Sequence, residues 1–183
     1  MKDSTQNSAM TLIECNEAEH ATAILDIFNE AIANSTALYD YQPRTAETMK
    51  NWFATKQKQG LPVIGAIDET GKLLGFASWG TFRAFPAYKY TIEHSIYIHH
   101  TQRGRGLGKI LLQALIERAK QSDQVHVMIG CIDATNAASI GLHEKLGFSH
   151  AGTFKQVGFK FGGWLDAAFY QLILNTPSQP QDG

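Results

Sequence analysis

Three glycines and two arginines alternate in the stretch QRGRGLG, which ends at Gly108. An extended apolar pattern precedes this stretch and a helical pattern follows it, so the glycines stand where a strand turns into a helix. Glycine lets the backbone approach a ligand closely, and the N–H groups at a helix N-terminus attract anions, most often phosphate. The junction therefore predicts a site for a phosphorylated ligand. A glycine turn that only begins a structural helix is the alternative.

Two common phosphate-binding motifs do not fit this junction. A Walker loop requires GxxxxGK followed by Ser or Thr, whereas the segment from Gly104 to Lys109 is one residue short and Ile110 follows it. A dinucleotide fingerprint requires GxGxxG after the first strand, whereas the spacing here is GxGxG and the strand comes late in the chain. The sequence therefore disfavours both a Walker-type nucleotide site and a NAD site.

A single carboxylate, Glu93, lies about ten residues before the glycines, in the extended stretch TIEHSIYI. Alternation along a strand places Glu93 on the same face as Ser95 and Tyr97, and His94 on the opposite face. A carboxylate beside a bound ligand can take a proton from an attacking amine, which reacts only as the free base. A solvated strand glutamate is the alternative.

The histidines and cysteines do not have the spacing of a metal site. His94 and His99 face opposite sides of a strand, and a rise of about 3.3 Å per residue puts His94 about 20 Å from His100. Cys15 and Cys131 have no CxxC spacing and no secretory context, so we expect reduced thiols. We expect no metal ion.

The elements that position these residues follow from apolar periodicity. We expect strands over residues 10–15, 62–68, 72–80, 90–99, 125–132, 148–158 and 160–174, and helices over residues 17–34, 45–60, 104–121 and 136–146. Hairpins mixed with helical crossovers predict an α/β fold with a mixed, mostly antiparallel central sheet and helices on both faces. Residues 10–174 would form one domain, with flexible tails over residues 1–9 and 175–183.

Length and charge agree with one domain of ordinary size. The chain has 183 residues, of which 44% are hydrophobic, and its formal net charge is −1. No broad basic field is present to attract nucleic acid or an anionic membrane, so we expect neither as a partner. The first ten residues lack the apolar segment of a secretory signal, and no run approaches the ~18 apolar residues of a membrane span. We therefore expect a cytoplasmic protein.

The glycine junction resembles the acyl-CoA pyrophosphate loop of the Gcn5-related N-acetyltransferase (GNAT) superfamily, written Q/R-x-x-G-x-G/A. Arg103, Gly106 and Gly108 occupy its key positions, with Gln102 beside them. The order of the expected elements also matches this superfamily. The resemblance therefore extends over nearly the whole chain, and it implies the GNAT fold.

A second stretch, NAASIGLHEKLGF, resembles the superfamily signature N-x-x-A-x-x-L-Y-x-K-x-G-F. It departs from that signature at His143, where tyrosine is common, and at Ser139. Within the superfamily, TIEHSIYIHHTQRGRGLG, GLHEKLGF and FKFGGWLD look most like the phosphinothricin and methionine sulfoximine acetyltransferases.

This resemblance implies direct transfer of an acetyl group from acetyl-CoA to the amino group of a small amino-acid-like substrate, without a covalent acetyl-enzyme. Glu93 would be the catalytic base, acting directly or through water. His143 could donate a proton to the departing thiolate, contact the substrate or be structural. The implied acetyl-CoA contacts are Ser95, Ile96, Tyr97, Ile98, Arg103, Gly104, Arg105, Gly106, Leu107, Gly108 and Asn136.

The loop TFRAFPAYKY suits a small zwitterion, because Arg83 can bind a carboxylate while aromatic rings cover an apolar stem. Expected substrate contacts are Phe82, Arg83, Ala84, Ile92, Glu93 and His94. An exposed loop with solvated charges is the alternative. Two other functions stay open. A polyamine or peptide acetyltransferase should show an acidic pocket or an open groove, and a non-catalytic acyl-CoA-binding sensor should bind the cofactor without turnover.

The resemblance also implies a homodimer. The segment KQVGFKFGGWLD places Phe159, Phe161 and Trp164 near a hairpin turn, which is more apolar material than an exposed turn normally carries.

Overall fold

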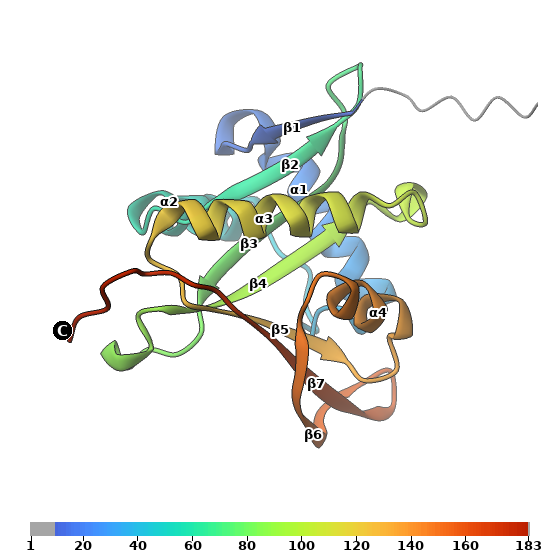
Figure 1. Ribbon diagram of the computed structural model, residues 1–183. Helices are drawn as coiled ribbons and strands as arrows, with labels where there is room; N and C mark the ends of the chain where they lie inside the picture. The colour runs from blue at the N-terminus through green and yellow to red at the C-terminus, as the bar shows by residue number, and fades with distance from the viewer. Residues whose placement is uncertain (1–9, 183) are drawn as a thin grey trace, which may run out of the picture.

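The computed structural model describes residues 10–182, which form a seven-stranded sheet with helices on both faces (Figure 1). The strand order is β1-β2-β3-β4-β5-β7-β6, and every neighbouring pair is antiparallel except β4 and β5. The strands are β1 (Thr11–Glu14), β2 (Val63–Ile67), β3 (Leu73–Thr81), β4 (Thr91–Ile98), β5 (Val127–Asp133), β6 (Ser149–Lys160) and β7 (Gly163–Ile173). The helices are α1 (Glu17–Asn34), α2 (Ala46–Lys58), α3 (Leu107–Ser122) and α4 (Ala137–Lys145). The expected fold class is confirmed.

Local signals begin the first two helices where the sequence predicts. The Asn16 side chain accepts a hydrogen bond from the backbone N–H of Glu19 at 2.9 Å and begins α1. Thr45 and Thr48 exchange side-chain and backbone hydrogen bonds in a capping box at the start of α2. These caps satisfy backbone donors that have no partner within the helix.

Two apolar clusters hold the helices against opposite faces of the sheet. On one face, α3 packs its leucines, among them Leu111 and Leu115, against strand residues such as Met128. On the other face, Phe28 of α1 meets the ring of Phe76 of β3 at 5.0 Å between centroids. Figure 1 shows α3 crossing the near face of the sheet while α1 and α2 lie behind it. The sheet is thus the middle of three layers.

The parallel pair at the centre of the sheet is short. β4 follows β3 from Ile92 to Ile98, but its register with β5 covers only Thr91 to Glu93. Beyond Glu93 the two strands diverge toward their C-terminal ends, as Figure 1 shows. Backbone groups on the β5 side of β4 are therefore left for a partner other than a strand.

Helix α3 begins three residues later than predicted. Gly104 has φ +79° and Gly106 has φ +78° and ψ 1°, which is left-handed backbone that an α-helix does not contain. The first two glycines therefore form the turn that precedes the helix, and Gly106 is its N-cap.

The C-terminal residues after β7 run back across the domain. The Thr176 hydroxyl donates to the Val125 carbonyl at 2.6 Å, and the Ser178 N–H donates to Asp123 at 3.1 Å. The backbone of Gln181 exchanges hydrogen bonds with the Tyr90 hydroxyl. These contacts hold residues 175–182 against the domain, where the composition led us to expect a flexible tail. The tail expected over residues 1–9, and residue 183, lie outside the described residues.

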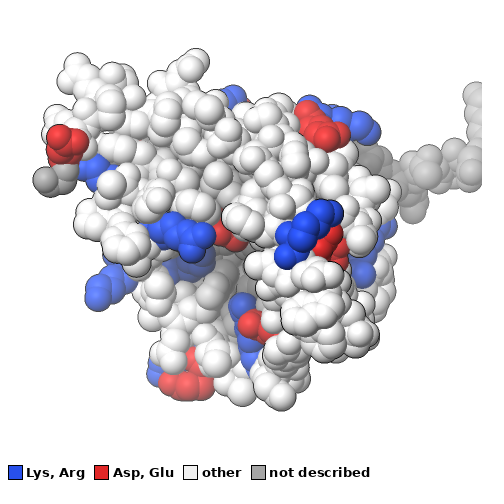
Figure 2. Space-filling view, turned by 90° about the horizontal axis from the view of Figure 1, so that it is seen from below, with Lys and Arg blue, Asp and Glu red and all other residues white. Residues whose placement is uncertain are grey.

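Charge and helix length add two observations. Positive and negative side chains are interspersed on the face seen in Figure 2, without a broad area of one sign. Within residues 10–182, no helix has both the length and the apolar character needed to cross a bilayer.

Candidate active site

A cavity of about 820 Å³ occupies the region where β4 and β5 diverge. Its walls come from β4, the glycine junction, the end of β5, the first turns of α4 and the loop that follows α1. All of the implied acetyl-CoA contacts except Arg105 line it: Ser95, Ile96, Tyr97, Ile98, Arg103, Gly104, Gly106, Leu107, Gly108 and Asn136. Arg105 instead hydrogen-bonds the Gln102 side chain.

The glycine junction has the features that a pyrophosphate requires. A Cβ atom added at Gly104 or Gly106 would meet no atom within 4 Å, so the turn leaves space for a ligand to approach the backbone. The N-terminal turn of α3 follows at once, and its first N–H groups have no acceptor within the helix. The Arg103 guanidinium lies beside them, paired with Glu30 of α1 at 2.5 Å. These residues fit the diphosphate of a CoA-type ligand.

Asn136 has a local structural role in addition to its place in the cavity wall. Its side-chain oxygen accepts a hydrogen bond from the Ser139 N–H at 3.0 Å and so begins α4.

Glu93 is a half-buried carboxylate in the cavity wall, at the last residue pair between β4 and β5. Burial raises its pKa above the ordinary value of 4.5, while the nearby Arg83 guanidinium acts in the opposite direction. A carboxylate with a raised pKa is a stronger base once it is ionised. The geometry therefore allows Glu93 to accept a proton from a ligand in the cavity.

Two further groups in the cavity wall, Cys131 and Asp133, differ in ionisation state at neutral pH. Although Cys131 is exposed, partial desolvation and then the Glu93 carboxylate raise the pKa of its thiol to about 11, so the thiol stays protonated at neutral pH and is a poor nucleophile. Burial acts to raise the pKa of Asp133, but hydrogen bonds from Thr36 and Thr135 outweigh it and hold this pKa below its ordinary value. Asp133 is therefore an anion whose oxygens are already occupied by hydroxyl and backbone donors.

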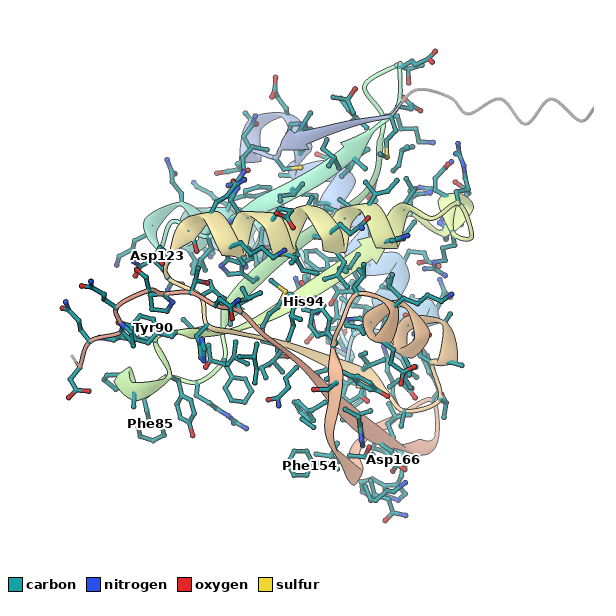
Figure 3. The ribbon with its side chains drawn as sticks, viewed as in Figure 1. Phe85, Tyr90, His94, Asp123, Phe154 and Asp166 are labelled. Carbon is teal, nitrogen blue, oxygen red and sulfur yellow. The ribbon has the colours of Figure 1, made fainter. Side chains whose placement is uncertain are left out.

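His94 and His143 form a buried, stacked pair with their Nε2 atoms 3.1 Å apart. The Nδ1 of His143 lies 2.7 Å from the Ser139 carbonyl oxygen, which can only accept, so this nitrogen carries the proton. His94 must then donate from Nε2. Its buried Nδ1 is left as an acceptor without a partner among residues 10–182. Figure 3 shows His94 in the interior, whereas Phe85 and Phe154 project from the surface.

The hydrogen bonds of His143 bear on whether it can donate a proton to the departing thiolate, one of the roles that the sequence left open. Both of its ring nitrogens are engaged, and the one facing His94 carries no proton. Burial lowers the pKa of His143, so a second proton is disfavoured. The geometry supports a structural or positioning role for this imidazole better than proton donation.

The pair predicts a pH dependence of stability. Burial and then His143 lower the pKa of His94 from 6.5 to about 3, so below pH 6.5 the unfolded chain binds a proton that the folded chain does not. The free energy of unfolding should therefore fall with a slope that grows from about 0.7 kcal/mol per pH unit at pH 6.5 to about 1.4 kcal/mol per pH unit near pH 5. Denaturant titrations of wild type and His94→Gln at several pH values measure this slope, and His20→Gln is the control. Equal slopes in wild type and His94→Gln would contradict the prediction.

The expected substrate contacts divide into two groups. Glu93 and His94 line the cavity, but Phe82, Arg83 and Ala84 lie on the loop between β3 and β4 and are outside its lining. Arg83 stacks on Phe82, with 5.1 Å between the guanidinium carbon and the ring centroid. Its effect on the pKa of Glu93 nevertheless places it within electrostatic reach of the site. The Ile92 side chain is buried in the apolar cluster under α3 and faces away from the cavity.

Sequence reasoning missed one whole wall of the cavity, the loop over residues 35–39. It also missed Asp133, which ends β5 and is only 6% exposed. A signal for the loop was present, because its two neighbouring tyrosines, Tyr39 and Tyr41, are unusual in a solvated connection.

Comparison with known proteins gives the same family as the motifs. Residues 23–148 match the family described as Acetyltransferase (GNAT) family. An L-methionine sulfoximine/L-methionine sulfone acetyltransferase of Pseudomonas aeruginosa is 49% identical over 158 residues, which cover 86% of this chain and 91% of that protein. A phosphinothricin N-acetyltransferase of Alcaligenes faecalis is 37% identical over 154 residues, which cover 84% of this chain and 78% of that protein.

Solved structures agree with this result. The structure of a GNAT superfamily phosphinothricin acetyltransferase from Sinorhizobium meliloti, in complex with acetyl-CoA, superposes with a TM-score of 0.88 at 35% identity. The match covers 93% of this chain and 92% of that chain. The resemblance drawn from the two motifs is confirmed.

Proposed function

Because the chain belongs to the acetyltransferase (GNAT) family, we propose that it transfers the acetyl group of acetyl-CoA to the amino group of a small amino-acid-like substrate. The substrate class is that of methionine sulfoximine, methionine sulfone and phosphinothricin, on which its relatives are named to act. A cytoplasmic location, where acetyl-CoA is available, is part of the proposal.

One observation carries the proposal beyond family membership. The cavity has a phosphate-type turn at residues 103–108, and a half-buried carboxylate with a raised pKa lies in another part of its wall. The unpaired edge of β4 connects these two features. Transfer of an acyl group from acyl-CoA to an amine needs this combination. The diphosphate and the reactive carbonyl of the ligand lie at opposite ends of a long amide-bearing arm, and a base is needed beside the carbonyl end.

Each part of the cavity then has a chemical task. Acetyl-CoA supplies the activated acetyl group as a thioester. The glycine junction and the N-terminus of α3 hold the diphosphate. The free edge of β4 over Ser95–Ile98 orients the amide-bearing arm and offers a backbone N–H to the thioester oxygen, where negative charge develops. Glu93 removes a proton from the amine, directly or through one water, and the nitrogen bonds to the acetyl carbon as the carbon–sulfur bond to CoA breaks. CoA leaves as the thiolate and takes up a proton from solvent, and the protonated Cys131 thiol supports transfer without a covalent enzyme intermediate.

Thiol release from acetyl-CoA, measured against a panel of acceptors, tests the proposal. We expect turnover with methionine sulfoximine, methionine sulfone and phosphinothricin, and little with polyamines or peptides. Acetyl-CoA binding without turnover for any acceptor would instead support the sensor function.

The acidic side chains in the cavity are the reason to include polyamines among the acceptors tested. Glu93 and Asp133 are both acidic, as a polyamine site would require. However, Asp133 already accepts hydrogen bonds from Thr36 and Thr135, so fewer of its acceptor sites are open to an ammonium group than on a solvated carboxylate. Preferential turnover of a polyamine would overturn the proposed substrate class.

A homodimer is part of the proposal. Phe161 and Trp164 lie at the turn between β6 and β7 and are 63% and 64% exposed, and Phe154 and Val157 add further apolar area on β6. A monomer rarely leaves such a patch in water. Light scattering should give about twice the chain mass of 20.2 kDa. Trp164→Glu should lower that mass toward the monomer, and a monomeric wild type at working concentration would refute the dimer.

A further inference from the structure

Lys160, the last residue of β6, is a buried cation that the proposed chemistry does not use. Its side chain is 5% exposed, and its Nζ donates to the backbone carbonyl of Ser35 at 2.8 Å and to that of Leu38 at 2.7 Å. None of the ion pairs among residues 10–182 includes it. The Asp40 carboxylate acts on Lys160 only from beyond ion-pair distance, so closer acceptors must replace the water that a buried ammonium group loses. The two loop carbonyls are those acceptors.

The positive charge of Lys160 also lies at the C-terminus of α1. That helix has no basic residue in its last turn, although the C-terminus of a helix carries partial negative charge. Ser35 is the C-cap of α1 and supplies one of the two carbonyls that Lys160 binds. A residue 125 positions later in the chain thus provides the missing cation.

The bound carbonyls belong to the cavity wall. Residues 35–39 all line the cavity, and they adjoin the part that contains Cys131 and Asp133, because both of these groups act on the pKa of Tyr39. Glu93 acts on Cys131 in turn, so the loop borders the part of the cavity that holds the proposed base.

Strand β6 contacts the same segment in two further ways. The Tyr39 ring lies over Gly158 so closely that a Cβ atom there would come within 2.6 Å of the ring. The Tyr41 hydroxyl donates to the Phe159 carbonyl at 2.5 Å. A loop without a helix or strand of its own is therefore fixed from one side by β6, and Lys160 makes one buried and one part-buried hydrogen bond to it.

We propose that Lys160 is a positioning residue for the acceptor substrate: by binding the carbonyls of Ser35 and Leu38, it fixes the loop that forms the acceptor side of the cavity. This inference rests on the proposed acetyl transfer to amino acids. Without the ammonium group, the buried Leu38 carbonyl and the part-buried Ser35 carbonyl lose their donor, and the loop should sample other conformations. The glycine junction has no contact with Lys160, so binding of acetyl-CoA should not depend on it.

Lys160→Met tests the proposal, because methionine keeps most of the length of the side chain but removes its hydrogen-bond donors and its positive charge. We expect KM for methionine sulfoximine to rise about tenfold or more, while KM for acetyl-CoA stays within about twofold. Hydrogen exchange at residues 36–39 should become faster. The matched control is Lys155→Met on the same strand, because the Lys155 side chain is 75% exposed and bonds only Asp166. This control should match the wild type in both measurements.

The results separate this proposal from the proposed function. If the wild type acetylates none of the amino acids, the proposed function fails, and the exchange rates of residues 36–39 decide the role of Lys160 alone. If Lys160→Met does not fold, Gly158→Ala perturbs the same loop by displacing Tyr39 and should raise the same KM. Unchanged exchange together with an unchanged KM for the acceptor, or equal rises in the KM of both substrates, would overturn the proposal.

Discussion

Replacing Glu93 by glutamine should lower kcat by about 10²- to 10⁴-fold at neutral pH, with little change in the affinity for acetyl-CoA. Glutamine keeps the shape and most of the hydrogen bonding of the side chain but cannot accept the amine proton. Initial rates and calorimetric titration with acetyl-CoA measure the two effects. Glu117→Gln is the control, because this glutamate lies on α3 outside the cavity and its side chain is 61% exposed.

The pH dependence gives this variant a second readout. Burial raises the pKa of Glu93, so wild-type kcat should fall as the pH drops through a value above the ordinary 4.5 of a glutamate. The variant lacks this group, and raising the pH should restore part of its activity because more substrate then arrives as free amine. A raised KM with nearly normal kcat at neutral pH would remove Glu93 from proton transfer.

Short-range patterns were sufficient for the features that depend on neighbouring residues. Strand alternation separated Glu93 from Ile92, which the structure buries in the core. It also put Tyr97 on the other face from Ile92, which the structure shows to be the face covered by α1. The glycines of the junction indicated an anion site because their backbone freedom is visible in the sequence itself. The start of α3 was wrong by three residues, because the sequence does not show which glycines adopt positive φ.

Contacts between residues far apart in the chain could not be predicted from these patterns. Lys160 and the carbonyl of Leu38 are 122 residues apart in the chain. The strand predicted over residues 148–158 ended before Lys160, so the sequence pattern placed this lysine in the following strand and not at the end of β6. The pairing of His94 with His143 spans 49 residues and needs the approach of α4 to β4. Alternation correctly placed His94 on the opposite face from Glu93, but it could not show that a second imidazole would meet it there.

Replacing Gly106 by valine should weaken acetyl-CoA binding by about ten- to a hundredfold. Gly106 has φ +78°, and a β-branched residue in this region costs on the order of 1–3 kcal/mol. A Cβ atom there meets no protein atom within 4 Å, so the substitution does not clash with the fold. The turn would therefore either keep its strain or relax out of the geometry that presents the N-terminus of α3. In addition, the side chain would enter the space that a diphosphate needs.

Calorimetric titration of folded Gly106→Val with acetyl-CoA measures the loss, and Gly71→Val is the matched control. Gly71 has φ +81° and equally open surroundings, but it lies in the turn between β2 and β3, outside the cavity lining. Both variants should lose a similar amount of stability in denaturant titrations, because both substitutions place a β-branched residue at a positive φ. Only Gly106→Val should lose affinity. If the two variants bind acetyl-CoA equally well, the strained turn does not hold the diphosphate, and the glycines at residues 104–108 serve only to begin α3.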